Sequence, residues 1–412
     1  MSVLAISDEQ QYIFNVNEEF DSIPMKISYS MKFSKSFTKE EICSAVEKCI
    51  NTADVFAARC VVKEAHPYIE FLPYQKKSIP VFDFSSEEEY QMFCRQSEAT
   101  NINNRDRLYY IFIFSIAGSF YHIHFIFNHL IFDGVSGLLL SEKIQEALIE
   151  PGLEIKWHPF SAHLEGIKNY YGSEKYLSDK EFWRDRFLEI SKSEYLFSDV
   201  IDRDESLNKS LSFHTSRELK ELLLEYCNMN NVSPYILIIT VLAQIINDKT
   251  GCKCFYFEIP IANRLGKNEK NSLGAYVTTF PFIFDFTRYN NISDLLKSVY
   301  KQSKDYYKHK NFDWNSKINS ESNEKEYGRY IPQFSFSYFC NNKKPSVSFA
   351  TLHHQHPESD VIPMALYISD YLDWQTMTFS YTYWGEYFTD EEVANIHQDI
   401  EAVISNIIST KI

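Results

Sequence analysis

The chain has 412 residues, of which 44% are hydrophobic and 16% aromatic, and only 11 are glycine. These values are typical of a packed globular protein with roughly two or three domain-sized parts, and they exclude fibrous and low-complexity proteins. The formal net charge of −15 argues against a long basic surface for nucleic acid.

The eight cysteines form no CxxC pair and lie within apolar patterns, where reduced cysteine behaves as a small hydrophobic residue. The N-terminus, MSVLAISDEQQ, lacks a basic segment followed by an apolar run, so we expect no signal peptide. Both observations favour a cytoplasmic protein.

Thr38 and Glu41 have the spacing of a capping box, which predicts a helix that ends near Asn51. The apolar stretch 109–127 is nearly long enough to cross a bilayer, but Ala-Gly-Ser at 117–119 interrupts it, which favours two strands joined by a tight turn. Other strands are expected at 24–33, 57–63 and 67–72, the hairpin at 107–128, and helices at 85–98 and 135–150.

Residues 150–205 are charged and irregular, with one helix expected at 179–190. Ser233 and Pro234 predict the start of a buried apolar helix, and Pro281 argues for an edge strand or a bulge. The remaining strands are expected at 210–215, 254–262, 275–286, 330–339, 362–369 and 377–384, and the remaining helices at 216–229, 233–248, 292–308 and 389–408.

Strands and helices are mixed without a regular βαβ alternation. This pattern predicts an α+β fold with two lobes of similar size, residues 1–175 and 176–412.

The segment FNHLIFDGVSG, residues 127–137, places His129 at the end of an apolar strand. Side chains alternate along a strand, so His129 shares one face with Tyr121, Ile123, Phe125 and Phe127. We expect that face to be buried and the ring to lie where the strand leaves the core. A partly desolvated but reachable histidine is suited to act as a base near neutral pH.

Asp133 and Gly134 then turn the chain into the next helix, whose first amides favour developing negative charge. The alternative is that His129 is only a hydrogen-bonded polar group at a strand end, which is the commoner situation.

The segment NHLIFDG, residues 128–134, resembles the HHxxxDG motif of condensation domains in nonribosomal peptide synthetases. Its HxxxD core resembles the wider superfamily of chloramphenicol-acetyltransferase-like acyltransferases. Further resemblances, in the same order and spacing, are ISDEQQYIF near the start, NTADVFAARC with Arg59, NNRDRLYYIFIF, and IANRLGKNEKNSLGAYVTTFPF with Arg264, Gly274, Tyr276, Val277 and Thr279.

The resemblance implies two chloramphenicol-acetyltransferase-like lobes arranged in a V around a central tunnel. It implies that His129 is the functional histidine and that the amide of Gly134 lies near the reacting carbonyl, where a side chain would crowd the site. Asp133 and Arg264 are implied to form a structural ion pair.

This sequence departs from the family pattern at two positions. Asn128 replaces the first histidine of the motif, a position implied to be structural, and an asparagine there can keep a hydrogen bond. Val135 replaces a common aromatic residue, whereas His129 itself is kept.

The implied function is that of a free-standing condensation enzyme in antibiotic or other secondary-metabolite biosynthesis. It would form an amide, or alternatively an ester, between an acyl thioester on a peptidyl or acyl carrier protein and a small-molecule amine or second carrier-bound acceptor. The phosphopantetheine arm arrives on the carrier, and no tightly bound cofactor, metal, nucleic acid or membrane is expected. We expect a monomer without adenylation or carrier segments.

Two other functions remain open. One is an acyl-CoA-dependent O- or N-acyltransferase of the same superfamily, although YLDWQ at 371–375 does not match the DFGWG segment of the plant-type enzymes. The other is a catalytically silent domain that recruits other enzymes.

Three further patterns are weaker. The run HHQH, with His353, His354 and His356, would suit a metal but is more often a solvated loop. GVSG at 134–137 is one residue short of a GxSxG nucleophile elbow. The basic segment 308–317 would help to dock an acidic carrier protein, although such a segment is usually only solvated.

Overall fold

The structure is a computed structural model that describes residues 2–19, 25–100, 102–194, 196, 208–264, 266–289, 291–314, 333–341, 350–355, 362–371 and 375–410. The chain forms two compact units. The first unit comprises Met1–Ser173, Ala262–Val277 and Pro345–Pro357. The second unit comprises Glu174–Ile261, Thr278–Lys344 and Glu358–Ile412. The predicted lobe limits, 1–175 and 176–412, stay a prediction.

The main sheet of the first unit has the strand order β12-β2-β7-β6-β5. Its strands are β2 (Lys26–Phe33), β5 (Val81–Phe84), β6 (Tyr109–Ile116), β7 (His122–Asn128) and β12 (Ala350–Gln355). The pairs are antiparallel except β5 with β6, which is parallel. β12 comes from a distant part of the chain and pairs with β2 through Ala350 opposite Phe33.

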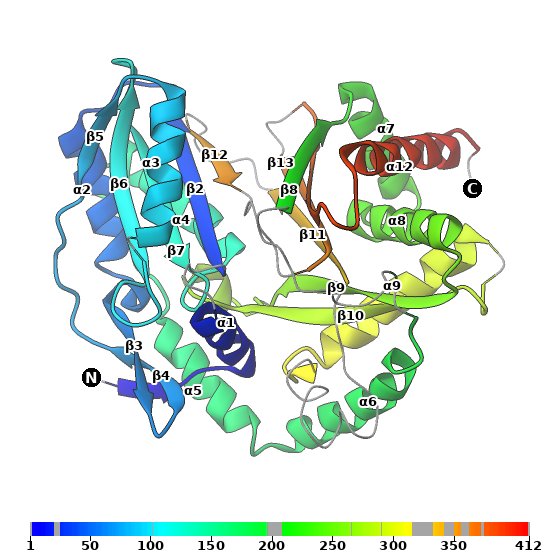
Figure 1. Ribbon diagram of the computed structural model, residues 1–412. Helices are drawn as coiled ribbons and strands as arrows, with labels where there is room; N and C mark the ends of the chain where they lie inside the picture. Colours follow the sequence, from blue (N-terminus) through cyan, green and yellow to red (C-terminus); the bar gives the residue numbers. More distant parts are fainter. Residues whose placement is uncertain are drawn as a thin grey trace. The chain divides into compact units, whose positions relative to one another are not determined.

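Helices cover both faces of this sheet (Figure 1). α3 (Glu87–Thr100) lies on one face, and α2 (Lys39–Ile50) and α4 (Gly134–Ile149) lie on the other. Every residue of β7 is consequently buried. The expectation of one buried face is therefore incomplete, because α3 also covers the face that carries His122 and His124.

The first unit also contains a small sheet with the order β1-β4-β3, formed by β1 (Ser2–Ala5), β3 (Ala58–Lys63) and β4 (His66–Phe71). Its remaining helices are α1 (Asp8–Glu19) and α5 (Phe160–Tyr170). α1 brings two buried side chains to the end of β7: Asn17 contacts its last residue, Asn128, and Gln10 contacts Leu130, which follows it.

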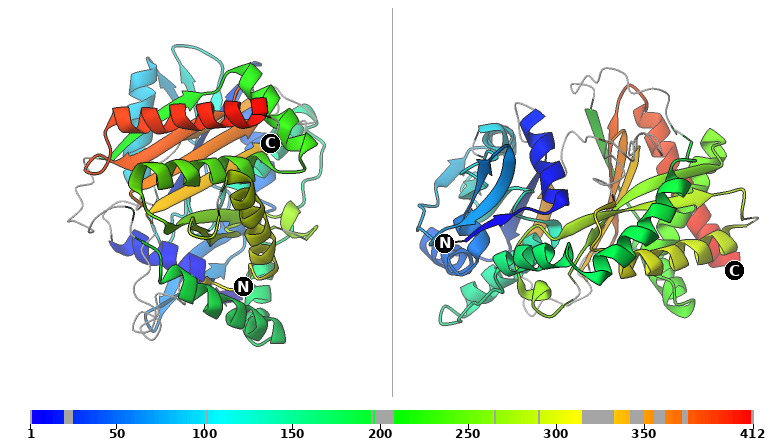
Figure 2. Two further views of the ribbon diagram at one scale, coloured as in Figure 1. Left: turned by 90° about the vertical axis from the view of Figure 1, so that its right-hand side faces the viewer. Right: turned by 90° about the horizontal axis from the view of Figure 1, so that it is seen from below.

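The second unit is built on a sheet with the order β10-β9-β11-β13-β14-β8. Helices α7, α8 and α12 lie on one face of it (Figures 1 and 2). The strands are β8 (Asn208–His214), β9 (Cys254–Ala262), β10 (Val277–Asp285), β11 (Phe334–Asn341), β13 (Met364–Tyr371) and β14 (Thr378–Trp384). The helices are α6 (Glu174–Ile190), α7 (Arg217–Met229), α8 (Pro234–Thr250), α9 (Ile292–Lys308) and α12 (Asp390–Thr410).

The mixed arrangement of strands and helices confirms the α+β prediction. Thr38 and Glu41 form a complete capping box before α2, and the Ser233 side chain caps α8. Pro281 lies in β10, an edge strand, as its missing N–H requires. The sequence did not predict α5, and α6 begins five residues earlier than expected, at Glu174.

None of the helices in the described ranges is by itself long and apolar enough to cross a bilayer. α7 and α8 meet that condition only when taken together, and they are bent by 106° at their junction. All eight cysteines lie in the described ranges, and none of them forms a disulfide bond.

Three buried histidines predict a stability that depends on pH. Burial lowers the pKa of His122 and His397 to about 4 and that of His124 to about 3. The unfolded chain binds these protons at its ordinary pKa of about 6.5, so stability is complete above that pH and decreases below it. Between pH 7 and 5 we expect a loss of roughly 1–2 kcal/mol for each histidine.

Urea unfolding of His397→Gln at pH 7 and pH 5 tests this expectation. The variant should lose less free energy of unfolding over this range than the wild type, whereas His66→Gln, at an exposed position, should match the wild type. An equal pH-dependent loss in the wild type and in His397→Gln would contradict the account.

Candidate active site

His129 follows directly after β7, at the point where the chain leaves the sheet. Its backbone N–H donates to the carbonyl oxygen of Met25, over 3.0 Å, which fixes its main chain next to the start of β2. The residue as a whole is half-buried, whereas its Nδ1 atom is buried and has no hydrogen-bond partner of good geometry within the described part of the chain. The ring is therefore partly desolvated.

Burial lowers the pKa of His129 below its ordinary value of 6.5. Three groups oppose this shift in pKa but do not cancel it: the backbone carbonyl of His129 itself, the Asp133 carboxylate and the Phe132 carbonyl. Burial thus favours the neutral form of the imidazole, which can accept a proton.

Asp133 holds the other end of this turn. It is the N-cap of α4, and its Oδ1 atom accepts from the backbone N–H of Ser136 over 2.8 Å. Its Oδ2 atom accepts from the N–H of Tyr276 over 3.0 Å. Arg264 Nη2 lies 2.9 Å from Oδ1 and 3.0 Å from Oδ2, and both side chains are buried. The residues predicted to form a buried pair are therefore in direct contact.

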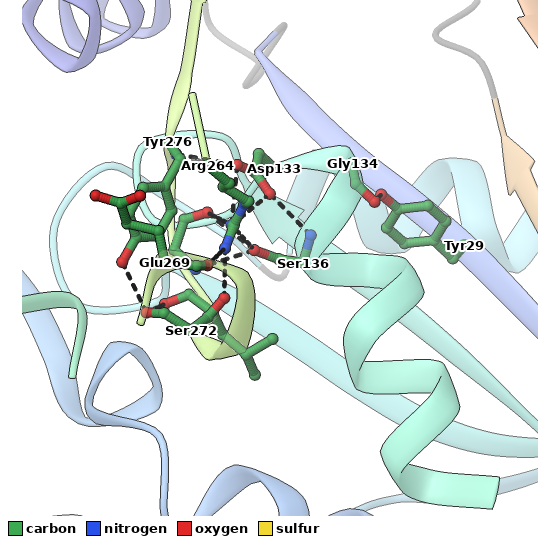
Figure 3. Close-up of polar contacts among 10 residues, drawn as sticks. Tyr29, Asp133, Gly134, Ser136, Arg264, Glu269, Ser272 and Tyr276 are labelled. Carbon is green, nitrogen blue, oxygen red and sulfur yellow. Dashed lines mark hydrogen bonds and ion pairs between the residues drawn. The ribbon is translucent and has the colours of Figure 1, made fainter. Parts of the chain in front are cut away.

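The guanidinium of Arg264 joins α4 to the loop that precedes β10 (Figure 3). Nη1 donates to the carbonyl oxygens of Glu269 and Ser272, over 2.8 and 2.5 Å. The guanidinium also stacks over the Tyr276 ring, with 4.0 Å between Cζ and the ring centroid. The ion pair is thus part of a larger buried network.

Ser136 belongs to the same network and is fully buried. Its Oγ atom donates to the carbonyl of Gly274 and accepts from Arg264 Nη2, over 2.9 and 2.7 Å. It also accepts from the N–H of Gly274 over 3.0 Å. A hydroxyl with all of these contacts is structural, so the near match of GVSG to a nucleophile elbow has no catalytic meaning.

Gly134 is the first residue of α4, and its carbonyl accepts from the Tyr29 hydroxyl over 3.4 Å. Two other glycines are required by close packing. A Cβ atom on Gly137 would lie 2.5 Å from Tyr29 Cζ, and one on Gly274 would lie 2.1 Å from Phe160 Cδ2. From the sequence a steric role was expected only at Gly134, so the steric roles of Gly137 and Gly274 were missed.

Asn128 is fully buried on the face of β7 opposite His129. Its Oδ1 atom accepts from the backbone N–H of Leu130 over 2.9 Å, so it caps the turn that carries the histidine. Leu130 is also held from α1, because Gln10 Nε2 donates to its carbonyl oxygen over 2.6 Å. In the sequence Gln10 appeared only within the segment ISDEQQYIF, which resembles the family. Its contact could not be predicted, because Leu130 lies 120 positions away.

The other predicted residues lie elsewhere. Arg59 forms an exposed ion pair with Glu70 between β3 and β4, with 2.6 Å between Nε and Oε2. The side chains of His353 and His354, and all of His356, lie outside the described residues. Within the described ranges, no three His, Cys, Asp or Glu side chains form a group that could hold a metal ion.

The basic segment 308–317 is described only as far as residue 314. Lys308 pairs with Asp305, and His309 Nδ1 lies 2.6 Å from the buried Asp179 Oδ1. These contacts are within the second unit, and a docking role for the segment stays a prediction. Val135 is a half-buried residue of the first turn of α4.

A family model, described as the condensation domain, matches residues 2–411. Surfactin synthase subunit 1 of Bacillus subtilis is 24% identical over 294 residues, which are 68% of this chain and 8% of that protein. A dimodular nonribosomal peptide synthase of the same organism is 24% identical over 195 residues, which are 44% of this chain and 8% of that protein. The chain thus spans a small part of the length of these relatives.

Solved structures show the same fold. The first condensation domain of the calcium-dependent antibiotic synthetase, in complex with a substrate analogue, matches with a TM-score of 0.83 and 12% identity, over 99% of this chain and 96% of that one. The condensation domain from the monacolin K polyketide synthase MokA gives a TM-score of 0.85 and 11% identity, over 99% and 98%. The predicted fold family is confirmed, whereas the V-shaped arrangement and the tunnel stay predictions.

The buried ion pair can be tested by removing one partner. Arg264→Met leaves the Asp133 carboxylate buried without its cation, which we expect to cost roughly 3–5 kcal/mol of unfolding free energy. Arg59→Met breaks the exposed pair with Glu70 and should cost less than about 1 kcal/mol. Urea unfolding of both variants measures the difference, and a cost for Arg264→Met as small as that for Arg59→Met would contradict the structural role.

Proposed function

Since the chain belongs to the condensation-domain family, we propose that it joins a carrier-tethered acyl or aminoacyl thioester to an amine acceptor in nonribosomal peptide biosynthesis. Condensation domains are acyltransferases that form amide bonds in this biosynthesis. The observation that carries the proposal for this chain is the half-buried imidazole of His129, held on a turn whose far end is fixed by Asp133 and Arg264. Burial lowers the pKa of this ring.

The chemistry assigns one task to the imidazole. The amine nitrogen attacks the thioester carbonyl carbon, a C–N bond forms and the carbonyl oxygen becomes an oxyanion. Because Nδ1 is buried, Nε2 is the ring nitrogen that takes the proton from the attacking amine. When the C–S bond breaks, the thiolate leaves and the proton returns from the imidazolium to the sulfur, which gives the amide and a free thiol.

The oxyanion is assigned to the N-terminus of α4. The first N–H groups of a helix have no acceptor within the helix, and they favour negative charge. Asp133 takes the N–H of Ser136, so the amide of Gly134 is the group that we assign to the developing oxyanion. Asp133 and Arg264 neutralise each other, and their role is to hold the turn.

The proposal also covers the partners and the setting. The acyl group arrives on the phosphopantetheine arm of a peptidyl or acyl carrier protein, and the acceptor is a small amine or a second carrier-bound group. The two reactants meet at the His129 ring, and holding them together there removes part of the entropic barrier. We place the reaction in the cytoplasm and propose an amide rather than an ester product.

The first test removes the imidazole. His129→Ala should lower the single-turnover rate of amide formation by about 10²-fold or more, since general base catalysis contributes roughly 10²–10⁴-fold. The substrates are a carrier-loaded acyl thioester and an amine, and product is followed by mass spectrometry. His66→Ala, at an exposed position, should react like the wild type.

The same assay separates the rival functions. Product from acyl-CoA at the same rate as from the loaded carrier would favour the acyl-CoA-dependent acyltransferase. A folded His129→Ala variant with an unchanged rate would contradict a catalytic histidine and would favour the recruitment domain.

The second test is the pH dependence of the rate. Burial lowers the pKa of His129 below 6.5. The acid limb of kcat/KM should therefore have its midpoint below pH 6.5. An acid limb centred at or above pH 6.5 would contradict a desolvated base at this position.

A further inference from the structure

We propose that Gln10, Asn17 and Asn104 are positioning residues for His129, which they fix through Asn128 and the backbone on both sides of the histidine. The side chains of Gln10, Asn17, Asn104 and Asn128 are together called the amide cluster. The inference rests on the proposed function of His129 and adds three residues to it. All four side chains are uncharged, and each residue is at most 4% exposed.

The amide cluster fixes the backbone before the ring. The N–H of His129 donates to the carbonyl oxygen of Met25 over 3.0 Å. The N–H of Met25 in turn donates to Asn17 Oδ1 over 2.9 Å. Asn17 lies on α1, so the position of His129 at the end of β7 depends on a helix that is distant in sequence.

The amide cluster also fixes the backbone after the ring. The N–H of Leu130 donates to Asn128 Oδ1 over 2.9 Å, and the carbonyl of Leu130 accepts from Gln10 Nε2 over 2.6 Å. The N–H and the C=O of Leu130 are thereby both held by side chains. Gln10 is held in turn, because its Oε1 atom accepts from the N–H of Ser7 over 3.0 Å.

The groups around position 128 are complementary to an amide. Asn128 Nδ2 donates to Asn104 Oδ1 over 3.0 Å and to the carbonyl of Asn103 over 3.1 Å. Asn17 Nδ2 donates to Asn128 Oδ1 over 3.3 Å and to Asn104 Oδ1 over 3.2 Å. Asn128 thus donates twice and accepts twice, the second time from the N–H of Leu130.

This count explains the departure from the family motif. A neutral imidazole has one donor and one acceptor, so a histidine at position 128 cannot make the four contacts of Asn128. Asn17 and Asn104 would then lose partners inside the protein, where an unsatisfied amide is costly. The asparagine is therefore the centre of a matched set of side chains, and its contacts do not change with pH because amides do not titrate.

The test removes the side-chain donor of Gln10. Gln10→Glu keeps the acceptor for the N–H of Ser7 but cannot donate to the carbonyl of Leu130. Gln11→Glu is the matched control, because Gln11 follows on the same helix and its side chain donates to Asn15, over 2.8 Å at an exposed position. Both variants add the same charge to α1, so their difference reports the lost contact with Leu130 together with the burial of the charge at position 10.

We expect Gln10→Glu to lower kcat by about tenfold or more while KM stays within about twofold, because a small displacement of the catalytic group costs rate rather than binding. Gln11→Glu should stay within about twofold of the wild type in both constants. Asn128→His should lower kcat in the same way, and a wild-type rate in Asn128→His would overturn the matched-set explanation.

A double-mutant comparison separates positioning from a general loss of structure. In the His129→Ala background, Gln10→Glu should leave the residual rate within about twofold, since a residue that acts through His129 has no effect in its absence. An equal fold-loss with and without His129 would overturn the proposal.

Amide hydrogen exchange gives a readout that does not need activity. Exchange at the N–H groups of His129 and Leu130 should be faster in Gln10→Glu than in Gln11→Glu and the wild type. If the wild type forms no amide product, the proposed function fails, and exchange still decides whether the amide cluster holds the turn. Unchanged exchange at both positions in Gln10→Glu overturns the proposal.

Discussion

The contact between Asp133 and Arg264 is the constraint on which the site depends. One buried carboxylate caps α4, accepts from the backbone of Tyr276 and neutralises a buried guanidinium. Because Arg264 and Tyr276 come from the segment Ala262–Val277, this contact joins a late part of the chain to the turn after β7. A carboxylate with this many partners cannot move, so the helix N-terminus next to it has a fixed position.

The two sides of the turn are held by different kinds of group. Asp133 and Arg264 act as opposite charges at its end, whereas uncharged amides hold its start, where His129 lies. A charge next to the imidazole would shift its pKa strongly, since buried charges interact over several ångströms. An amide cluster at this place fixes the backbone and leaves burial as the main influence on the ring.

Local patterns in the sequence predicted much of the fold. The capping box at Thr38, the cap at Ser233 and the edge position of Pro281 depend on neighbouring residues, and all three are confirmed. β12 was missed because its place beside β2 depends on a pairing between segments more than 300 residues apart. The burial of both faces of β7 was missed for another reason: the alternation along the strand does not show that α3 packs on its second face.

The site residues also divide into those found by a continuous motif and those held by contacts between distant segments. The motif that contains His129 and Asp133 is continuous in sequence, and the resemblance to condensation domains named Arg264 as the partner of Asp133. Asn17 belongs to no quoted motif and lies 111 positions from Asn128. Asn104 lies in the segment NNRDRLYYIFIF, but nothing in that segment indicated its contact with Asn128. A buried amide cannot be recognised from the sequence, since asparagine occurs mostly at exposed positions and in turns.

The central claim is that the turn holds His129 as a desolvated, neutral base. The most direct measurement is an NMR titration of the His129 ring in the intact chain, with His129→Gln used to assign the resonance. The account predicts a titration midpoint below pH 6.5, because burial opposes the charged ring. A midpoint at or above pH 6.5 would show a solvated or charge-stabilised ring and would contradict the account.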